Sequence, residues 1–278
     1  MTTLAFDAAG LAALEAGEIA VLGVPYDERS SYLRGAALAP PRIREALHSP
    51  SANMTSESGR DLSGLSDWRD LGDLGALQGE LALDAIEQAV GQILDRGGRT
   101  ICLGGDHSIA YPILRAYGPR HPQLTVLQID AHPDLYDSFE GDRFSHACPF
   151  ARVMEQGLVR RLVQVGIRTC NPHQRAQAER FGVEIIEMRH WHTGLDLRLE
   201  GPLYLSLDLD ALDPAFAPGV SHHEPGGLSS RELLSIIQGL PGTLVGADIV
   251  EYNPTRDDLG ITGMLAAKLL REIIDKML

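Results

Sequence analysis

Short runs of apolar residues alternate with longer amphipathic segments along the chain, and this alternation restricts the fold more than any other feature. Most of the apolar runs are nearly continuous, which is typical of strands that are covered on both faces. The segments between them are suited to helices that connect parallel strands. We therefore predict an α/β fold, a three-layer αβα sandwich with a mainly parallel central sheet. The predicted strands are Ile19–Val24, Thr100–Leu103, Thr125–Ile129, Leu162–Ile167, Val183–Glu187, Leu203–Leu209 and Leu244–Val250.

Local signals mark the ends of several helices. Asn171-Pro172 is typical of an N-cap followed by the first helical residue, and Gly182 is a typical C-terminal stop. Ser229–Glu232 has the spacing of a capping box. Apolar residues on one stripe predict two more helices, at Leu81–Leu94 and at about Thr262–Met277.

The length and the irregular stretches bear on domain organisation. The chain has 278 residues, and we expect a single domain over residues 1–278. Ser49–Asp73, rich in Ser, Gly and Asp, is expected to be a long surface connection within that domain, and Tyr136–Ser145 a second one. Long loops inside a compact domain are often functional.

Charge and the N-terminal sequence restrict partners and location. The formal net charge of −14 argues against nucleic acid or an anionic membrane surface as the main partner and suits a small cationic molecule. Residues 1–17 contain no Lys or Arg, unlike a targeting segment. No stretch approaches the roughly 20 apolar residues that a membrane-spanning helix needs. These features predict a cytoplasmic protein with no membrane partner.

Three polar clusters lie where predicted strands end. They are Gly104–Ser108 (GGDHS), Asp130–Asp134 (DAHPD) and Ser206–Pro214 (SLDLDALDP). The carboxyl ends of the strands form the ligand-binding edge of an open parallel sheet. We therefore expect the three clusters to converge on one edge.

The spacing of the acids within these clusters points to bound cations. Residues two apart on a strand face the same side, so Asp208 and Asp210 should project together, and Asp130, His132 and Asp134 share this spacing. Carboxylates gathered in one crevice repel one another unless a positive charge offsets them.

Four carboxylates, of Asp130, Asp134, Asp208 and Asp210, carry a charge of about −4, which matches two divalent cations. Oxygen-rich ligation with only two imidazoles, His107 and His132, favours Mn²⁺ over zinc. Two such ions, roughly 3.5–4 Å apart, can acidify one bridging water. A single Asp-x-Asp pair is more often a solvated turn, and the metal prediction depends on the three clusters together. Phosphate binding by the paired glycines is weakly supported, because no complete phosphate-binding pattern is present.

With these motifs the chain resembles the ureohydrolase (arginase/agmatinase) family, whose metal signatures are GGDHS, DAHxD and SxDxDxxDPxxxPG. Gly104–Ser108, Asp130–Asp134 and Ser206–Gly219 match them in full. The resemblance extends from Gly23 to the last helix. It implies the arginase-like fold, a homotrimer or homohexamer, and a hydrolase that uses two Mn²⁺ ions to release urea from a small cationic guanidino substrate.

The resemblance also implies how the metal ligands are shared. One Mn²⁺ would be held by His107, Asp130, Asp134 and Asp208. The other would be held by Asp130, His132, Asp208 and Asp210.

Four side chains are predicted to act on the substrate. By resemblance, Glu251 orients the guanidinium and His146 relays a proton to the leaving amine, while Asp210 and the metals stabilise the tetrahedral intermediate. His222 is a candidate for the substrate mouth and is equally consistent with an ordinary loop histidine. The alternatives for Glu251 and His146 are a charge that faces water and a surface histidine.

Three segments resemble plant-type arginases and favour cleavage of L-arginine to L-ornithine and urea. They are Asp130–Gly141, Ser145–Met154 and Pro218–Leu228. Agmatinases usually have a TGTP-like run where this chain has Val220–His223. Agmatine is the second candidate substrate and 4-guanidinobutyrate the third.

Two other classes of protein remain as alternatives. A zinc amide hydrolase of the deacetylase type shares the architecture but uses one metal ion. A catalytically silent subunit would be expected to lack a ligand or the glutamate, and the sequence retains the six ligands and Glu251.

Overall fold

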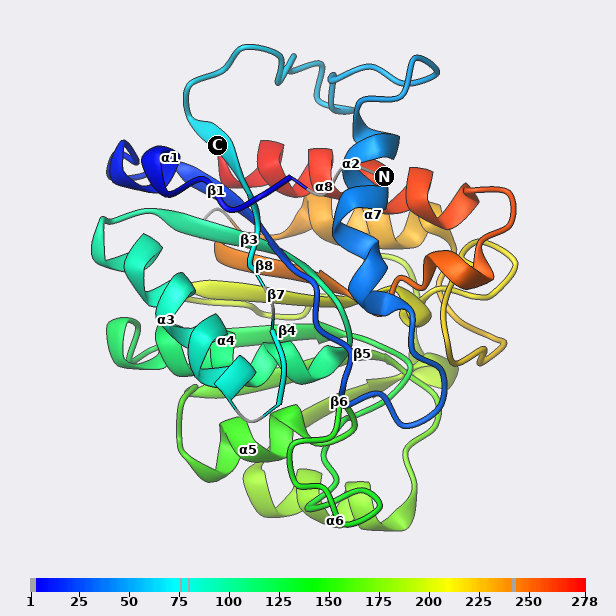
Figure 1. The fold of residues 1–278 in the computed structure, drawn as a ribbon. Coiled ribbons are helices and arrows are strands. Elements are labelled where there is room, and N and C mark those ends of the chain that lie inside the picture. Colours follow the sequence, from blue (N-terminus) through cyan, green and yellow to red (C-terminus); the bar gives the residue numbers. More distant parts are fainter. Residues whose placement is uncertain (1–3, 76, 80, 242–243) are drawn as a thin grey trace.

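The computed structural model describes residues 4–75, 77–79, 81–241 and 244–278. Within these ranges eight strands form one sheet in the order β2-β1-β3-β8-β7-β4-β5-β6, and all neighbouring strands are parallel (Figure 1). The strands are β1 (Ile19–Val24), β2 (Trp68–Asp73), β3 (Arg99–Gly104), β4 (Thr125–Ile129), β5 (Arg161–Ile167), β6 (Glu184–Glu187), β7 (Leu203–Asp208) and β8 (Leu244–Val250). The α-helices are α1 (Ala8–Ala12), α2 (Ala39–Leu47), α3 (Leu81–Asp95), α4 (Ala110–Tyr117), α5 (Pro149–Glu155), α6 (Pro172–Phe181), α7 (Ser230–Gly239) and α8 (Ile261–Met277).

Helices cover both faces of the sheet. Helices α2, α7 and α8 lie on one side, and α3, α4, α5 and α6 lie on the other (Figure 1). Alternate residues of β1 supply the two cores: Ile19 and Val21 pack beneath α2 and α8, whereas Ala20 and Leu22 pack beneath α3 and α4. The predicted three-layer α/β sandwich with a parallel sheet is confirmed. None of the described helices is long and apolar enough to cross a membrane.

The predicted strands and helix ends agree closely with the structure. All seven predicted strands are present, and β1, β4 and β8 have the predicted ends. Asn171 caps α6 by accepting a hydrogen bond from the Gln174 amide, and Gly182 ends this helix in the left-handed conformation. Ser229 and Glu232 form the predicted capping box of α7.

The expected surface connection at Ser49–Asp73 is partly wrong, because its last six residues form the edge strand β2. The polar residues Arg69, Asp70 and Asp73 interrupt the apolar pattern of this strand. Helices α2, α4 and α5 were not predicted either. Each has proline in its first turn, a position that proline tolerates although it otherwise indicates a break.

Arg44 of α2 holds the edge strand β2 through two carboxylates. Its Nε lies 2.6 Å from Asp70 Oδ2, its Nη2 lies 2.8 Å from Asp70 Oδ1, and its Nη1 donates to Asp73. Arg44 and Asp73 are both buried. Removal of the guanidinium would therefore leave a buried carboxylate without its counter-charge.

We expect Arg44→Met to lower the free energy of unfolding by about 3–5 kcal/mol, because the substitution keeps the packing of the stem and removes only the charge. The matched control is Arg42→Met in the same helix, whose ion pair with Glu45 is exposed. That change should cost less than about 1 kcal/mol. Urea unfolding curves measure both values, and equal losses for the two variants would contradict this account of Arg44.

Candidate metal centre

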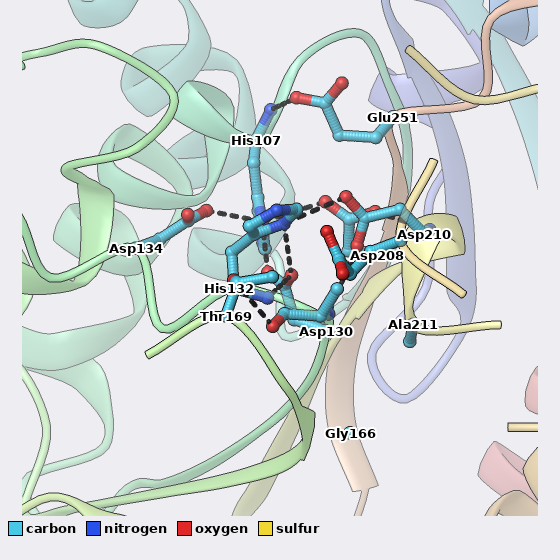
Figure 2. A network of polar contacts seen from close by, with 12 residues as sticks. His107, Asp130, His132, Asp134, Gly166, Thr169, Asp208, Asp210, Ala211 and Glu251 are labelled. Carbon is cyan, nitrogen blue, oxygen red and sulfur yellow. Dashed lines mark hydrogen bonds and ion pairs between the residues drawn. The ribbon is translucent and has the colours of Figure 1, made fainter. Parts of the chain in front are cut away.

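The three polar clusters meet at the carboxyl ends of the central strands. His107 follows β3, the cluster beginning at Asp130 follows β4, and Asp208 ends β7. Glu251 follows β8, which lies between β3 and β7 in the sheet. Figure 2 shows the six predicted ligands gathered at this edge with Glu251 beside them. The predicted convergence is therefore observed.

His107 lies at the centre of one group of acids. Its Nδ1 is 3.0 Å from Asp130 Oδ2, 3.0 Å from Asp134 Oδ2 and 3.3 Å from Asp208 Oδ2. His107, Asp130 and Asp208 are almost fully buried. Asp134 adopts a left-handed backbone conformation with φ of 51°. A non-glycine residue in that region is uncommon, and such conformations cluster at functional sites.

His132 lies at the centre of a second group, which shares Asp130 with the first. Its Nδ1 is 3.0 Å from Asp210 Oδ2 and 3.5 Å from Asp130 Oδ1. Ligand atoms of His132, Asp130 and Asp210 lie within 4.8 Å of one another, as do those of the first group's His107, Asp130 and Asp134. The geometry therefore offers two adjacent candidate positions for a metal ion, and they share the Asp130 carboxylate.

The expectation that Asp208 and Asp210 project from one continuous strand is wrong. Strand β7 ends at Asp208, and Leu209–Ala211 form a 3₁₀ turn. Asp208 Oδ1 accepts a hydrogen bond of 2.7 Å from the Asp210 amide and caps this turn. The turn still directs Asp208 toward His107 and Asp210 toward His132. The two acids therefore project together as predicted, but because of the turn and not because of an extended strand.

Burial and mutual repulsion shape the electrostatics of the cluster. Burial and the neighbouring Asp130 charge raise the pKa of Asp134 to about 6. Burial and the charge of Asp210 likewise raise the pKa of Asp208 well above its usual range. Burial alone would lower the pKa of the His107 imidazole, but the surrounding carboxylates outweigh it and raise that pKa well above its usual value. The cluster therefore favours positive charge at its centre.

The donor set fits divalent cations. His107 Nδ1 is enclosed, and among the described residues no hydrogen-bond partner of suitable geometry reaches it, although three carboxylate oxygens lie close. Four carboxylates and two imidazoles form an oxygen-rich set without thiolates, which suits hard or intermediate cations. The residues therefore fit the predicted metal site, and the role of each as a ligand stays a prediction.

A buried hydrogen-bond chain that the sequence did not reveal supports His107. Its Nε2 lies 3.0 Å from Ser206 Oγ, which donates to Asp248 Oδ1 at 2.9 Å. The Tyr204 hydroxyl donates to the other oxygen of Asp248, also at 2.9 Å. Such partners orient a metal-binding histidine. Asp248, a charged residue within the apolar run of β8, was the signal in the sequence that could have indicated this chain.

Glu251 is buried between the turn that carries His107 and the His146 ring. Its Oε1 accepts a hydrogen bond of 2.9 Å from the His107 amide and lies 2.7 Å from His146 Nδ1. Among the described residues, Oε2 has no hydrogen-bond partner. Burial would raise the Glu251 pKa, but His146 and the His107 amide lower it. Glu251 lines a cavity of about 200 Å³, so the alternative of a charge that faces bulk water is wrong.

His146 is buried beside Glu251, so the alternative of a surface histidine is wrong. Burial would lower its pKa, but Glu251 and two aspartates raise it to about 9. Its Nε2 lies 2.8 Å from Ser31 Oγ and 3.2 Å from the Ser31 amide, a residue that the sequence did not single out. The amide contact requires a lone pair on Nε2, whereas the acids favour a protonated ring. The Ser31 hydroxyl can donate or accept, so it can pair with either form of the ring, whereas a proton on Nε2 would break the amide contact.

One further residue lines the cavity, and another supports the backbone of the Asp210 turn. The His222 ring lies 5.8 Å from the His132 ring and 5.4 Å from the His146 ring, between centroids, and His222 lines the cavity. Arg168, which follows β5, donates to the carbonyl oxygens of Asp210 at 2.7 Å and Glu224 at 2.6 Å. The sequence did not reveal Arg168, because its partners are backbone atoms of a distant loop.

A parallel α/β sandwich with a carboxylate–imidazole cluster at its carboxyl edge defines a class of proteins that bind ligands where the strands end. The family model described as "Arginase family" matches residues 17–275. The chain belongs to this family, and it is a hydrolase of the kind that acts on guanidino groups.

Relatives and solved structures agree with this assignment. Arginase 1, mitochondrial, of Arabidopsis thaliana is 46% identical over 92% of this chain and 80% of its own length. An agmatinase of Bacillus anthracis is 33% identical over 94% of this chain and 92% of its own length. The structure of arginase from Medicago truncatula has a TM-score of 0.87 and 43% identity over 97% of this chain and 91% of that one.

The prediction of a cytoplasmic protein is wrong in the light of these relatives. Similar plant arginases are named mitochondrial or chloroplastic/mitochondrial, which points to an organelle and not to the cytoplasm. The prediction depended on the composition of residues 1–17 and on the lack of a long apolar stretch. Neither property identifies a compartment.

We expect Asp208→Asn to weaken the binding of divalent cations by more than about 100-fold. Loss of a residue that only hydrogen-bonds to a metal ligand typically costs less than this. Asparagine keeps the oxygen that caps the turn and removes one repelling charge. The melting temperature of the metal-free protein should therefore not fall. Thermal unfolding in chelator and in added Mn²⁺ measures both effects. Asp84→Asn, an exposed change on α3, is the control. Wild-type metal content in the Asp208 variant would exclude it as a ligand.

Proposed function

We propose that this chain is a dinuclear manganese hydrolase that converts L-arginine and water to L-ornithine and urea. The observation that carries the proposal is a largely buried group of four carboxylates and two imidazoles beside a cavity that Glu251 also lines. Similarity to plant arginases supports arginine as the substrate.

Two adjacent groups that share Asp130 support two cations per chain. We assign one ion to His107, Asp130, Asp134 and Asp208, and the other to Asp130, His132, Asp208 and Asp210. The oxygen-rich donors support Mn²⁺ as the metal. When bound, such a pair of cations supplies a water whose pKa is lowered toward neutrality, which provides the nucleophile.

Glu251 is proposed to orient the guanidinium. A guanidinium is planar and permanently charged, and it pairs well with carboxylate oxygens. The His107 amide and His146 hold Oε1, so Oε2 remains to accept an N–H from the substrate. The substrate carbon is thereby kept in one position relative to the acids, which lowers the entropic part of the barrier.

His146 is proposed to transfer a proton, and Asp210 is proposed to stabilise the intermediate. The neighbouring acids raise the pKa of His146 to about 9, which favours a protonated ring, and His146 is proposed to relay a proton to the leaving amine. Asp210, which accepts a hydrogen bond from the Ala131 amide at 3.2 Å, is proposed to stabilise the tetrahedral intermediate together with the metals. His222 is proposed to line the substrate mouth.

Two alternative substrates and the assembly state complete the proposal. The agmatinase relative supports agmatine as the second candidate, and 4-guanidinobutyrate is the third. The family resemblance supports a homotrimer or homohexamer, with one active cavity per chain.

A panel of guanidino substrates tests the proposal. With Mn²⁺ present, we expect urea release from L-arginine with kcat/KM at least about 100-fold above that for agmatine, because a site that pairs with a carboxylate discriminates strongly against an analogue without it. Metal analysis should find two manganese ions per chain. A preference for agmatine would exclude arginine as the main substrate, and one zinc per chain with no urea would favour a deacetylase-type enzyme. Two bound ions with no hydrolysis of any guanidino compound would favour a catalytically silent subunit.

We expect Glu251→Gln to lower kcat/KM for the preferred substrate roughly 10- to 100-fold, because the amide places an N–H donor where Oε2 is proposed to accept from the substrate. Metal content should stay at the wild-type value, since Glu251 is not assigned as a ligand. Steady-state kinetics and metal analysis of the same preparation measure the two effects. Loss of metal together with activity would contradict the role given to Glu251.

A further inference from the structure

The loop that follows β1 brings a hydroxyl group to the cavity, and the proposed hydrolysis gives this group no role. Ser31 lines the cavity of about 200 Å³ together with His146 and Glu251. Ser31 is an exposed residue, whereas His146 is only 8% exposed. Ser31 therefore connects a buried imidazole to the solvent side of the cavity.

The residues beside Ser31 fix this loop from two directions. Arg29 Nη1 donates to Asp142 Oδ2 at 2.8 Å, and the Arg29 carbonyl oxygen accepts from the His146 amide at 3.2 Å. On the other side, the fully buried Asp106 accepts a hydrogen bond of 3.0 Å from the Arg29 amide through Oδ2. The loop is thus tied to the segment that carries His146, and the position of Ser31 is set before a substrate binds.

Glu251 determines which nitrogen of the His146 ring can exchange a proton. Glu251 Oε1 lies 2.7 Å from His146 Nδ1 and also accepts from the His107 amide at 2.9 Å. A carboxylate can only accept, so Nδ1 carries a hydrogen in both the neutral and the charged ring. The proton that His146 gains and loses must therefore be the one on Nε2.

The Nε2 atom of His146 faces Ser31. The Ser31 hydroxyl oxygen lies 2.8 Å from it and the Ser31 amide nitrogen 3.2 Å. The amide can only donate and so pairs with the neutral ring alone, whereas the hydroxyl can donate to the lone pair of Nε2 or accept from its N–H. Among the described residues, the hydroxyl is therefore the group that stays paired with Nε2 in both protonation states.

We propose that the Ser31 hydroxyl relays the proton that His146 exchanges with solvent. After the ring has lost its Nε2 proton, the hydroxyl gives its own proton to Nε2 and takes one from a hydronium ion or a buffer acid. One N–H bond and one O–H bond form while the serine O–H bond and the donor's bond to hydrogen break, so serine is regenerated and the ring gains one positive charge. The inference rests on the proposed hydrolysis, in which His146 supplies a proton to the leaving amine. Ser31 acts through His146 and is a positioning residue.

The test is Ser31→Ala, which removes the hydroxyl and keeps the amide. We expect kcat for the preferred guanidino substrate to fall about 10-fold, a part of the usual contribution of acid–base catalysis, because water delivers the proton less efficiently. KM should stay within about twofold, because the hydroxyl is not assigned to guanidinium binding. The solvent deuterium isotope effect on kcat should rise, since proton delivery to the ring then limits turnover. Ser31→Thr keeps a hydroxyl and should restore kcat to within about threefold of the wild-type value.

Tyr32→Phe is the matched control, because it removes a hydroxyl from the next residue of the same loop. Tyr32 is 67% exposed and is not among the described residues that line the cavity. The substitution retains the ring that packs against His222. Both kcat and the isotope effect should stay at the wild-type values.

An unchanged kcat in Ser31→Ala would overturn the inference. A loss that Ser31→Thr does not restore would also overturn it, and so would an equal loss in Tyr32→Phe. Either result would show that the shape of the loop matters and that the relay does not.

Chemical modification separates these results from failure of the proposed function. Diethyl pyrocarbonate adds to an unprotonated ring nitrogen, and peptide mass spectrometry gives the rate at each histidine. In Ser31→Ala the rate at His146 should rise about threefold or more, because Nε2 loses its hydroxyl partner, whereas the exposed His190 should react as in the wild type. A faster reaction at His146 supports its pairing with Ser31 even if no urea is released. Urea release with kcat and the His146 rate both unaltered overturns the relay and leaves the hydrolase intact.

Discussion

The concentration of negative charge at one sheet edge is the constraint on which this structure depends. Four carboxylates and Glu251 are buried at this edge, and all but Asp130 line one cavity, where a low effective dielectric strengthens their repulsion. The two central imidazoles respond with raised pKa values, and backbone amides of neighbouring turns supply further compensation. An arrangement of this kind is costly for a fold unless a cation occupies it, which is why the acids are the strongest evidence for function.

The sheet makes this concentration possible. Strands β3, β8, β7 and β4 are neighbours, although they come from four separate parts of the sequence, and their carboxyl ends bring the acids together (Figure 1). Close backbone contacts then set the fine geometry. A Cβ at Gly105 would lie 1.7 Å from the Tyr26 carbonyl oxygen, so a larger residue would displace the turn that carries His107. Arg168 similarly ties the segment after β7 to the end of β5.

Much of this site could be predicted from local sequence, because the ligand candidates occur in compact motifs directly after apolar strands. The limits of prediction are equally physical. Strand β2 was missed since its two aspartates pair with Arg44, which lies 26 residues before Asp70, and no local pattern reports such a pairing. Extended geometry was assumed for the chain from Asp208 to Asp210, because alternate spacing does not distinguish an extended chain from a 3₁₀ turn. Ser31 and Gln174 reach the cavity through tertiary contacts alone, so their positions required the structure.

Helix α6 contributes a wall of the cavity, yet none of the residues assigned to metal binding or proton transfer lies on it. Its first turn can therefore vary while the reactive machinery on β3, β4, β7 and β8 is retained. In such a scaffold, divergence between descendants of a duplicated gene can change the nutrient that is consumed long before it changes the bond that is broken.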